Sequence, residues 1–154
     1  MKKEILKRIF EFLEEKGEHR IPLKWKLINN EPLTKEDLNV KGYLDLSDLE
    51  ITSLPKGLKV GGDLDLYNTK ITSLPEGLKV GGDLDLYNTE IRLLPQGLEV
   101  GGSLYIQRTK IKSLPEGLEV GGDLYINTTP LTKYTDEELR EMIKPGFIKG
   151  KIAR

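Results

Sequence analysis

A segment of 20 residues repeats along most of this 154-residue chain, and its fixed period is the strongest constraint on the fold. Residues 60–79 give the fullest form, VGGDLDLYNTKITSLPEGLK, and residues 80–99 keep 15 of those 20 positions. A period this short and constant is typical of solenoids, in which each repeat packs only on its neighbours. Each unit opens with a valine, at Val40, Val60, Val80, Val100 and Val120.

The pattern inside one unit predicts a single strand followed by an extended return path. Leucines alternate with polar residues in the segment DLDLY, which places Leu64 and Leu66 inside and the polar side chains on the opposite face. Pro75 and Gly77 exclude a helix in the remainder of the unit. We expect the glycine pair that precedes the strand, Gly61 and Gly62, to adopt positive φ angles.

The two ends of the chain differ from the repeats and predict helical caps. At the N-terminus five apolar residues recur at helical spacing, and Gly17 is expected to end that helix. Thr135 and Glu138 form a capping-box pattern ahead of a short amphipathic helix, and the tail FIKGKIAR alternates like an edge strand. We therefore expect a single mostly β domain over 1–154: an N-terminal helical cap (1–39), about five parallel solenoid rungs (40–134), and a C-terminal cap helix and tail strand (135–154).

Composition limits the classes of function. A net charge of −1 predicts no bulk attraction to nucleic acid. The absence of cysteine excludes disulfides, thiolate nucleophiles and Cys-ligated metals. Charged residues interrupt the apolar positions near the N-terminus, so we expect neither a secretory signal nor a membrane span, and a cytoplasmic location.

The repeat unit resembles the leucine-rich repeat, LxLxxNxLxxLPxxL, over about 95 residues. Its length is similar to that of the shortest bacterial class of these repeats. Its residue pattern resembles that of small leucine-rich-repeat proteins encoded by tailed bacteriophages and prophages. The resemblance implies a right-handed parallel solenoid with its strands, and usually its partner, on the concave side. It implies no particular activity. The matching residues in the second unit are Leu64-x-Leu66-x-x-Thr69-x-Ile71-x-x-Leu74-Pro75-x-x-Leu78.

One position departs from the family pattern. Where the family has asparagine, four units of this chain have threonine, so we expect the usual asparagine ladder to be missing. A threonine hydroxyl can still bond a nearby backbone group in a turn, which predicts a structural role for these side chains. They are Thr69, Thr89, Thr109 and Thr129, and the first unit has Leu49 there.

The outward strand positions carry aspartates and tyrosines but no lysine or arginine. Neighbouring rungs lie ~4.8 Å apart, so aligned carboxylates repel one another and the pKa of some should rise. Exposed tyrosines beside a charge cluster are typical of protein-binding hot spots. We predict a non-enzymatic interaction module that docks a partner protein with a basic surface. The candidate partner-binding residues are Asp45, Asp63, Asp65, Tyr67, Asp83, Asp85, Tyr87, Tyr105, Asp123 and Tyr125.

Other interpretations stay open at this point. In one interpretation the aspartates only make the protein more soluble. In another they bind divalent cations weakly. In a third, the chain is a structural or virion-assembly component. The one histidine, His19, lies in a polar segment outside the repeats, so we assign no catalytic residue, metal site or cofactor. A monomer without nucleic-acid or membrane partners is favoured, and the phage resemblance implies a host protein as the partner.

Overall fold

The computed structural model describes residues 2–16 and 22–154, which fall into two compact units, Met1–Leu33 and Thr34–Arg154. The first unit contains the helices α1 (Lys2–Glu15) and α2 (Leu23–Asn29). Helix α1 confirms the helix predicted from the N-terminal apolar spacing, whereas Gly17 and His19 lie outside the described residues. The single domain and the packing of 1–39 on the first rung stay predictions. No helix in the described ranges is long and apolar enough to cross a membrane.

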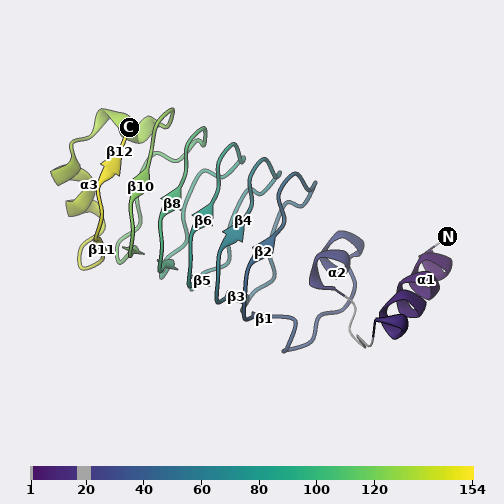
Figure 1. Ribbon diagram of the computed structural model, residues 1–154. Coiled ribbons are helices and arrows are strands. Elements are labelled where there is room, and N and C mark those ends of the chain that lie inside the picture. Colours follow the sequence, from purple (N-terminus) through teal and green to yellow (C-terminus); the bar gives the residue numbers. More distant parts are fainter. Residues whose placement is uncertain (1, 17–21) are drawn as a thin grey trace. The chain divides into compact units, whose positions relative to one another are not determined.

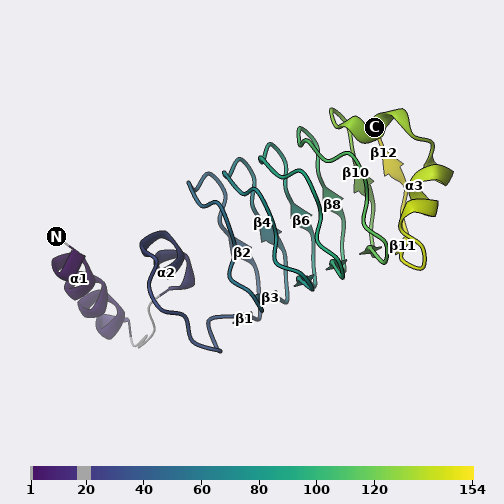
Figure 2. The same cartoon turned by 180° about the vertical axis from the view of Figure 1, so that it is seen from behind.

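The second unit is a parallel β-solenoid with a repeat of about 20 residues (Figures 1 and 2). Its turns follow one another in a row, and each contributes strands that pair with those of the turns before and after. The strand predicted from the DLDLY segment is present in every repeat. We name the resulting sheet the Leu sheet; its strands are β2 (Leu44–Asp45), β4 (Leu64–Asp65), β6 (Leu84–Asp85), β8 (Leu104–Tyr105), β10 (Leu124–Tyr125) and β12 (Ile152–Ala153).

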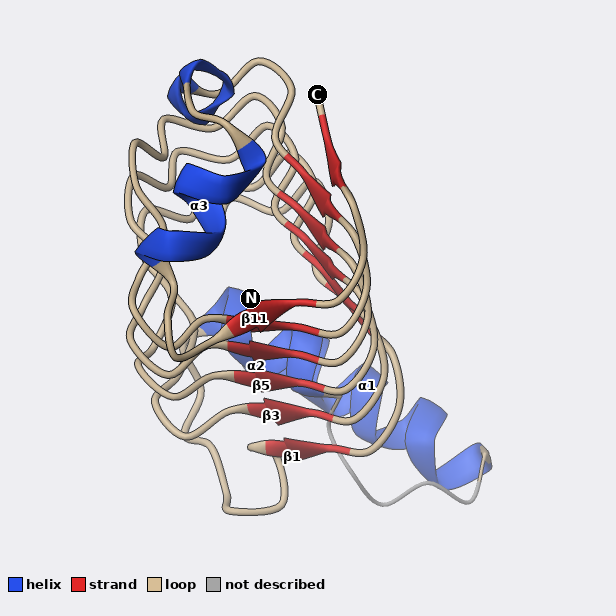
Figure 3. Cartoon of the chain, turned by 90° about the vertical axis from the view of Figure 1, so that its left-hand side faces the viewer, coloured by secondary structure: helices blue, strands red, loops and turns tan. Residues whose placement is uncertain are grey.

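Each turn also contributes a second short strand, so the expectation of one strand per unit was wrong. Leu78 and Val80 are buried and Lys79 between them is exposed, which is the alternation of a strand. Figure 3 shows the two sheets on adjoining sides of the solenoid. We name the second one the Val sheet; its strands are β1 (Asn39–Val40), β3 (Lys59–Val60), β5 (Lys79–Val80), β7 (Glu99–Val100), β9 (Glu119–Val120) and β11 (Phe147–Ile148).

The core is built from columns of identical or similar aliphatic side chains. In the second repeat Leu64, Leu66 and Ile71 are fully buried, and the equivalent residues of the later turns are buried in the same way. Residues at the same position of neighbouring repeats pair with one another: Leu64 pairs with Leu84, and Leu84 with Leu104, each 20 residues on. This spacing confirms that the 20-residue period is the structural repeat.

Two polar ladders run beside the core. The buried threonine hydroxyls donate to the carbonyl oxygen three residues earlier, at 2.9 Å for Thr69, which confirms their structural role. The usual asparagine ladder is missing at the threonine position, as expected, but the sequence analysis did not foresee a different ladder beside it. The side-chain amide of Asn68 donates to Asp48 at 2.8 Å and that of Asn88 donates to Asn68 at 2.7 Å, one position before the threonines. These residues have φ angles of 55 to 58°, a left-handed conformation that Asn and Asp tolerate well.

The glycine pair serves close packing, and the expectation of positive φ at Gly61 and Gly62 was wrong. The positive φ angles belong to the glycine after Leu-Pro-x, with φ of 70° at Gly77. A Cβ on Gly61 would lie 2.4 Å from the carbonyl oxygen of Lys41, closer than real side chains come. Side chains are therefore excluded where one turn rests on the turn before it. The column that must lack them is Gly61, Gly81, Gly101 and Gly121.

The C-terminal end departs from the repeat after Thr129. A short 3-10 helix (Pro130–Lys133) leads to α3 (Asp136–Met142), whose start has the predicted capping box. The tail forms both β11 and β12 rather than one edge strand, and they extend the two sheets beside β9 and β10. The guanidinium of Arg140 in α3 donates to the carbonyl oxygens of Ile148 and Gly150, at 2.8 Å for Gly150. The helix thus holds the segment that joins the two tail strands.

Candidate binding face

The Leu sheet brings the ten candidate residues together on one outward surface, which we call the Asp/Tyr face. Strand residues such as Asp65 and Tyr105 point away from the core and are partly buried. The other candidates lie directly before the strands, as Asp63 does, or two residues after them, as Tyr67 does. Three columns therefore run across the turns, as the sequence pattern predicted. The members of the face are Asp45, Asp63, Asp65, Tyr67, Asp83, Asp85, Tyr87, Tyr105, Asp123 and Tyr125.

The aspartates of the first column tie each turn to the next. Oδ1 of Asp63 accepts a hydrogen bond from the backbone N–H of Asp83 at 2.8 Å, and Asp83 accepts one from Ser103 at 2.7 Å. At the end of the column, Oδ1 of Asp123 accepts from the N–H of Lys151 in the tail at 2.9 Å. Such bonds satisfy backbone donors between turns. Sequence reasoning missed this structural role because each bond joins residues 20 or more positions apart.

The aspartates of the second column bond within their own turn. Oδ1 of Asp65 accepts from the N–H of Tyr67 at 2.9 Å, and Asp85 does the same with Tyr87 at 2.8 Å. This local bond is characteristic of aspartate at the end of a strand, where the chain bends. One carboxylate oxygen of each is therefore used in the fold.

Crowding of carboxylates affects Asp85 in particular. Its pKa is raised above the ordinary value of 3.8, first by burial and then by the negative charges of Asp65 and Asp83. The hydrogen bond from Tyr87 acts in the opposite direction and is outweighed. The predicted rise in pKa is confirmed at this carboxyl group, the last aspartate of the second column.

The tyrosines form two stacked pairs. The rings of Tyr67 and Tyr87 have centroids 5.4 Å apart and planes 17° apart, and those of Tyr105 and Tyr125 lie 4.6 Å and 5° apart. The pKa of Tyr105 is raised, first by burial and then by the charge of Asp83. Stacking holds the rings in place before any partner arrives, so little side-chain entropy is left to lose on binding.

Arg108 brings a positive charge to this surface that the sequence analysis did not include. Its guanidinium lies over the ring of Tyr87, 5.7 Å from the centroid. The residue occupies the left-handed column of Asn68 and Asn88, with a φ of 55°. The replacement of asparagine by arginine in that column was the signal available in the sequence. Six carboxylates still outnumber this one guanidinium, so the Asp/Tyr face remains acidic.

The carboxylates do not converge on a point. Across the described ranges, no group of three His, Cys, Asp or Glu side chains is arranged to hold a metal ion. A calcium ion takes six to eight oxygens around one centre, whereas the columns spread their carboxylates along the sheet. The geometry suits an extended partner surface better than a single cation.

The raised pKa of Asp85 predicts a pH dependence of stability. A carboxyl group with a higher pKa in the folded protein binds its proton more tightly when folded, so the free energy of unfolding falls as pH rises from 3.8 through the folded pKa. Asp85→Asn removes the charge and keeps an oxygen for the N–H of Tyr87. We expect this variant to lose part of the decline that begins near pH 3.8. Urea unfolding at a series of pH values measures it, and identical pH profiles for both proteins would contradict the assignment.

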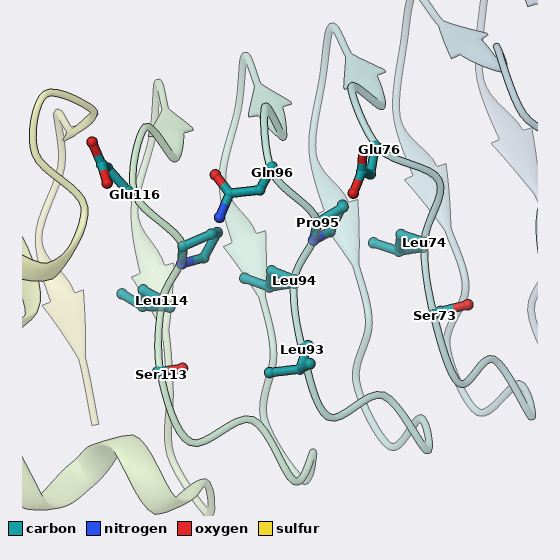
Figure 4. A pocket seen from close by; sticks show the side chains of 11 residues that line it. Ser73, Leu74, Glu76, Leu93, Leu94, Pro95, Gln96, Ser113, Leu114 and Glu116 are labelled. Atoms are coloured by element: carbon teal, nitrogen blue, oxygen red, sulfur yellow. The ribbon is translucent and has the colours of Figure 1, made fainter.

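A hollow lies on the Leu-Pro side of the solenoid. Figure 4 shows Leu93 between Ser73 and Ser113 of the neighbouring turns, with Gln96 between Glu76 and Glu116. Leu93 is 67% exposed. Both residues were visible in the sequence as departures from the unit. They replace a serine by an apolar side chain and a glutamate by a neutral one at these two positions.

Comparison with known proteins found no relative of this chain. The chain matches no family model, no curated protein and no solved structure.

Proposed function

We propose that this solenoid is a non-enzymatic interaction module that binds a partner protein with a basic surface through the Asp/Tyr face. The observation that supports it is the presence of stacked tyrosine pairs beside crowded carboxylates on one sheet surface. Crowding disfavours the charged form of Asp85, and a lysine or arginine of a partner would remove that penalty. The tyrosines supply rigid apolar area next to those charges.

The finer assignment follows from the repeat pattern. We infer a short leucine-rich repeat of the bacterial class, with the terminal helices as caps and the partner on the concave side. Resemblance to phage-encoded repeat proteins supports a host protein as the partner and a modulator or inhibitor as the role. Acidic steering would speed the encounter with a basic target.

The test compares two double substitutions that add the same charge to different sides of the solenoid. Asp65→Lys/Asp85→Lys reverses two charges on the Asp/Tyr face, and Glu76→Lys/Glu116→Lys reverses two on the Leu-Pro side, where both glutamates are exposed. Each variant and the wild type is used to capture proteins from a nuclease-treated bacterial lysate. We expect a basic protein bound by the wild type and by the Glu variant, and lost from the Asp variant.

The captured protein is then purified, and its affinity is measured by calorimetry. We expect reversal at Asp65 and Asp85 to weaken binding at least roughly 10-fold to 100-fold, as loss of paired charges does at other interfaces. Asp65→Asn/Asp85→Asn keeps the oxygen acceptors for the backbone N–H groups and removes only the charge. A similar loss of affinity in this variant would show that charge, and not folding, is the cause. Equal capture by all variants would contradict the proposal and favour a structural or assembly role.

A further inference from the structure

The outer surface of the Val sheet consists of one ridge of side chains beside a strip that has none. The ridge is formed by the outward strand residues, which the pairing register places in one column: Asn39, Lys59, Lys79, Glu99, Glu119 and Phe147. The strip is the glycine column at 61, 81, 101 and 121, which begins beside Lys41 and ends beside Lys149. Ridge and strip line one shallow hollow over β5, β7 and β9.

Charge along this ridge is divided between its halves. Lys59 and Lys79 occupy the half nearer the N-terminus, and Glu99 and Glu119 occupy the other half. An ion pair of 2.9 Å joins Lys79 to Glu99 at the centre. The outer pairs, Lys59 with Lys79 and Glu99 with Glu119, are like charges on adjacent parallel strands, which repel.

A ridge with this order of charges is complementary to itself. When a second copy is turned about a two-fold axis that crosses the ridge between β5 and β7, Lys79 lies opposite Glu99 and Lys59 lies opposite Glu119 in both directions. This is the isologous contact of a symmetric dimer. In the parallel arrangement each charge would instead meet its own copy.

The glycine strip makes the close approach possible. The two-fold axis places ridge against ridge and strip against strip, so the lysine and glutamate side chains of the two copies meet directly. Because the column at Gly81 and Gly101 has no side chains, it leaves room beside the ridge into which these long side chains can bend. A side chain cannot be accommodated in this column, since a Cβ on Gly101 would meet the carbonyl oxygen of Gly81 at 2.2 Å. The same requirement of the fold that excludes side chains from this column thus leaves a bare strip beside the ridge.

We propose that the Val sheet is a self-association surface, on which a second copy of this chain binds antiparallel through Lys59, Lys79, Glu99 and Glu119. Five intervals of ~4.8 Å make the ridge ~24 Å long, and its narrow contact is smaller than the ~800 Å² per partner of a stable interface. The dimer is therefore weak and salt-sensitive, with a dissociation constant of roughly 0.1 to 1 mM at low ionic strength. Well below this concentration the chain stays the monomer that the sequence favours. The Asp/Tyr faces stay open, because they lie on the other sheet (Figure 3).

Sedimentation equilibrium on the full chain with designed charge variants tests this arrangement. Glu99→Lys/Glu119→Lys makes the ridge uniformly positive, and Lys59→Glu/Lys79→Glu makes it uniformly negative. We expect each variant alone to dissociate at least 10-fold more readily than the wild type, and a mixture of the two to form a heterodimer. The variant with all four substitutions restores the order of charges with the signs exchanged, and we expect it to dimerise like the wild type.

The experiment needs separate controls for folding and for partner binding. The ion pair lost in these variants is exposed and contributes little to stability, so their circular dichroism should match the wild type. The Glu76→Lys/Glu116→Lys and Asp65→Lys/Asp85→Lys variants should both dimerise normally, so that failure of partner binding does not affect this result. A wild type that is monomeric at about 1 mM in low salt, uniform variants that associate as the wild type does, or a mixture without heterodimer would each overturn the proposal.

Discussion

Replacing Gly101 with alanine should lower the free energy of unfolding by at least about 3 kcal/mol. An ideal Cβ at this position lies 2.2 Å from the carbonyl oxygen of Gly81 and 3.0 Å from its carbon. Both atoms belong to the backbone of the preceding turn, so neither can move aside as a flexible side chain would. Relief requires the turns to separate, which breaks the strand pairing between β5 and β7 on that side. Urea unfolding followed by circular dichroism measures the loss.

Gly42→Ala is the matched control for this substitution. A Cβ on Gly42 has no heavy atom within 4 Å, and the residue lies in the first repeat, where no earlier turn of the solenoid supports it. We expect its effect to stay within about 0.5 kcal/mol. Equal losses for the two variants would show that contact between turns is not the reason for the glycine column.

Leu104→Ala should cost about 2 to 5 kcal/mol of unfolding free energy. The side chain is fully buried in β8, between Leu84 of one neighbouring turn and Leu124 of the other. Both neighbours belong to rigid hydrogen-bonded ladders, so the cavity left by the deletion cannot collapse. The midpoint of urea unfolding should fall while the slope of the transition stays unchanged.

The exposed Leu93 provides the comparison for this core deletion. It is 67% exposed, so Leu93→Ala removes little buried area and should change stability by less than about 0.5 kcal/mol. A cost close to that of Leu104→Ala would contradict the division into core and surface columns described above.

The sequence predicted the Leu sheet and its inward side chains well, since both depend on a local pattern. Alternation around Leu64 and Leu66 covers five residues, enough to identify a strand without knowledge of its neighbours. The second strand escaped because its alternation spans only Leu78, Lys79 and Val80, and a Pro-x-Gly turn precedes it. A three-residue pattern is too short to distinguish a strand from an extended loop.

Errors at the glycines and asparagines have a common physical cause. Position 61 requires glycine because a carbonyl oxygen 20 residues earlier leaves no room for a Cβ. Asn68 forms its ladder with a residue that is also 20 positions away. Neither reason is present inside one repeat, so reasoning about local φ angles placed the positive φ at the wrong glycine. Contacts between turns become visible only when the repeats are stacked in register.

The sequence predicted which residues share the Asp/Tyr face, but not the contacts that they make there. Side-chain direction follows from strand alternation, so the grouping of Asp65, Asp85 and the tyrosines needed only the register. The bond from Asp83 N–H to Asp63 and the position of Arg108 over Tyr87 depend on the chain path between turns. These contacts join different turns, so they cannot be inferred from the pattern within one repeat.

The tail held by Arg140 limits how such an array can change in length. Because β11 and β12 come from residues after α3, the final positions of both sheets are occupied by a segment outside the repeat pattern. A further unit beyond this tail would have to pair with β11 and β12, which do not have the repeat sequence. A unit duplicated between two internal turns would instead meet the same partners on both sides. Such a chain is expected to evolve by internal duplication of whole units, with the tail strands unchanged.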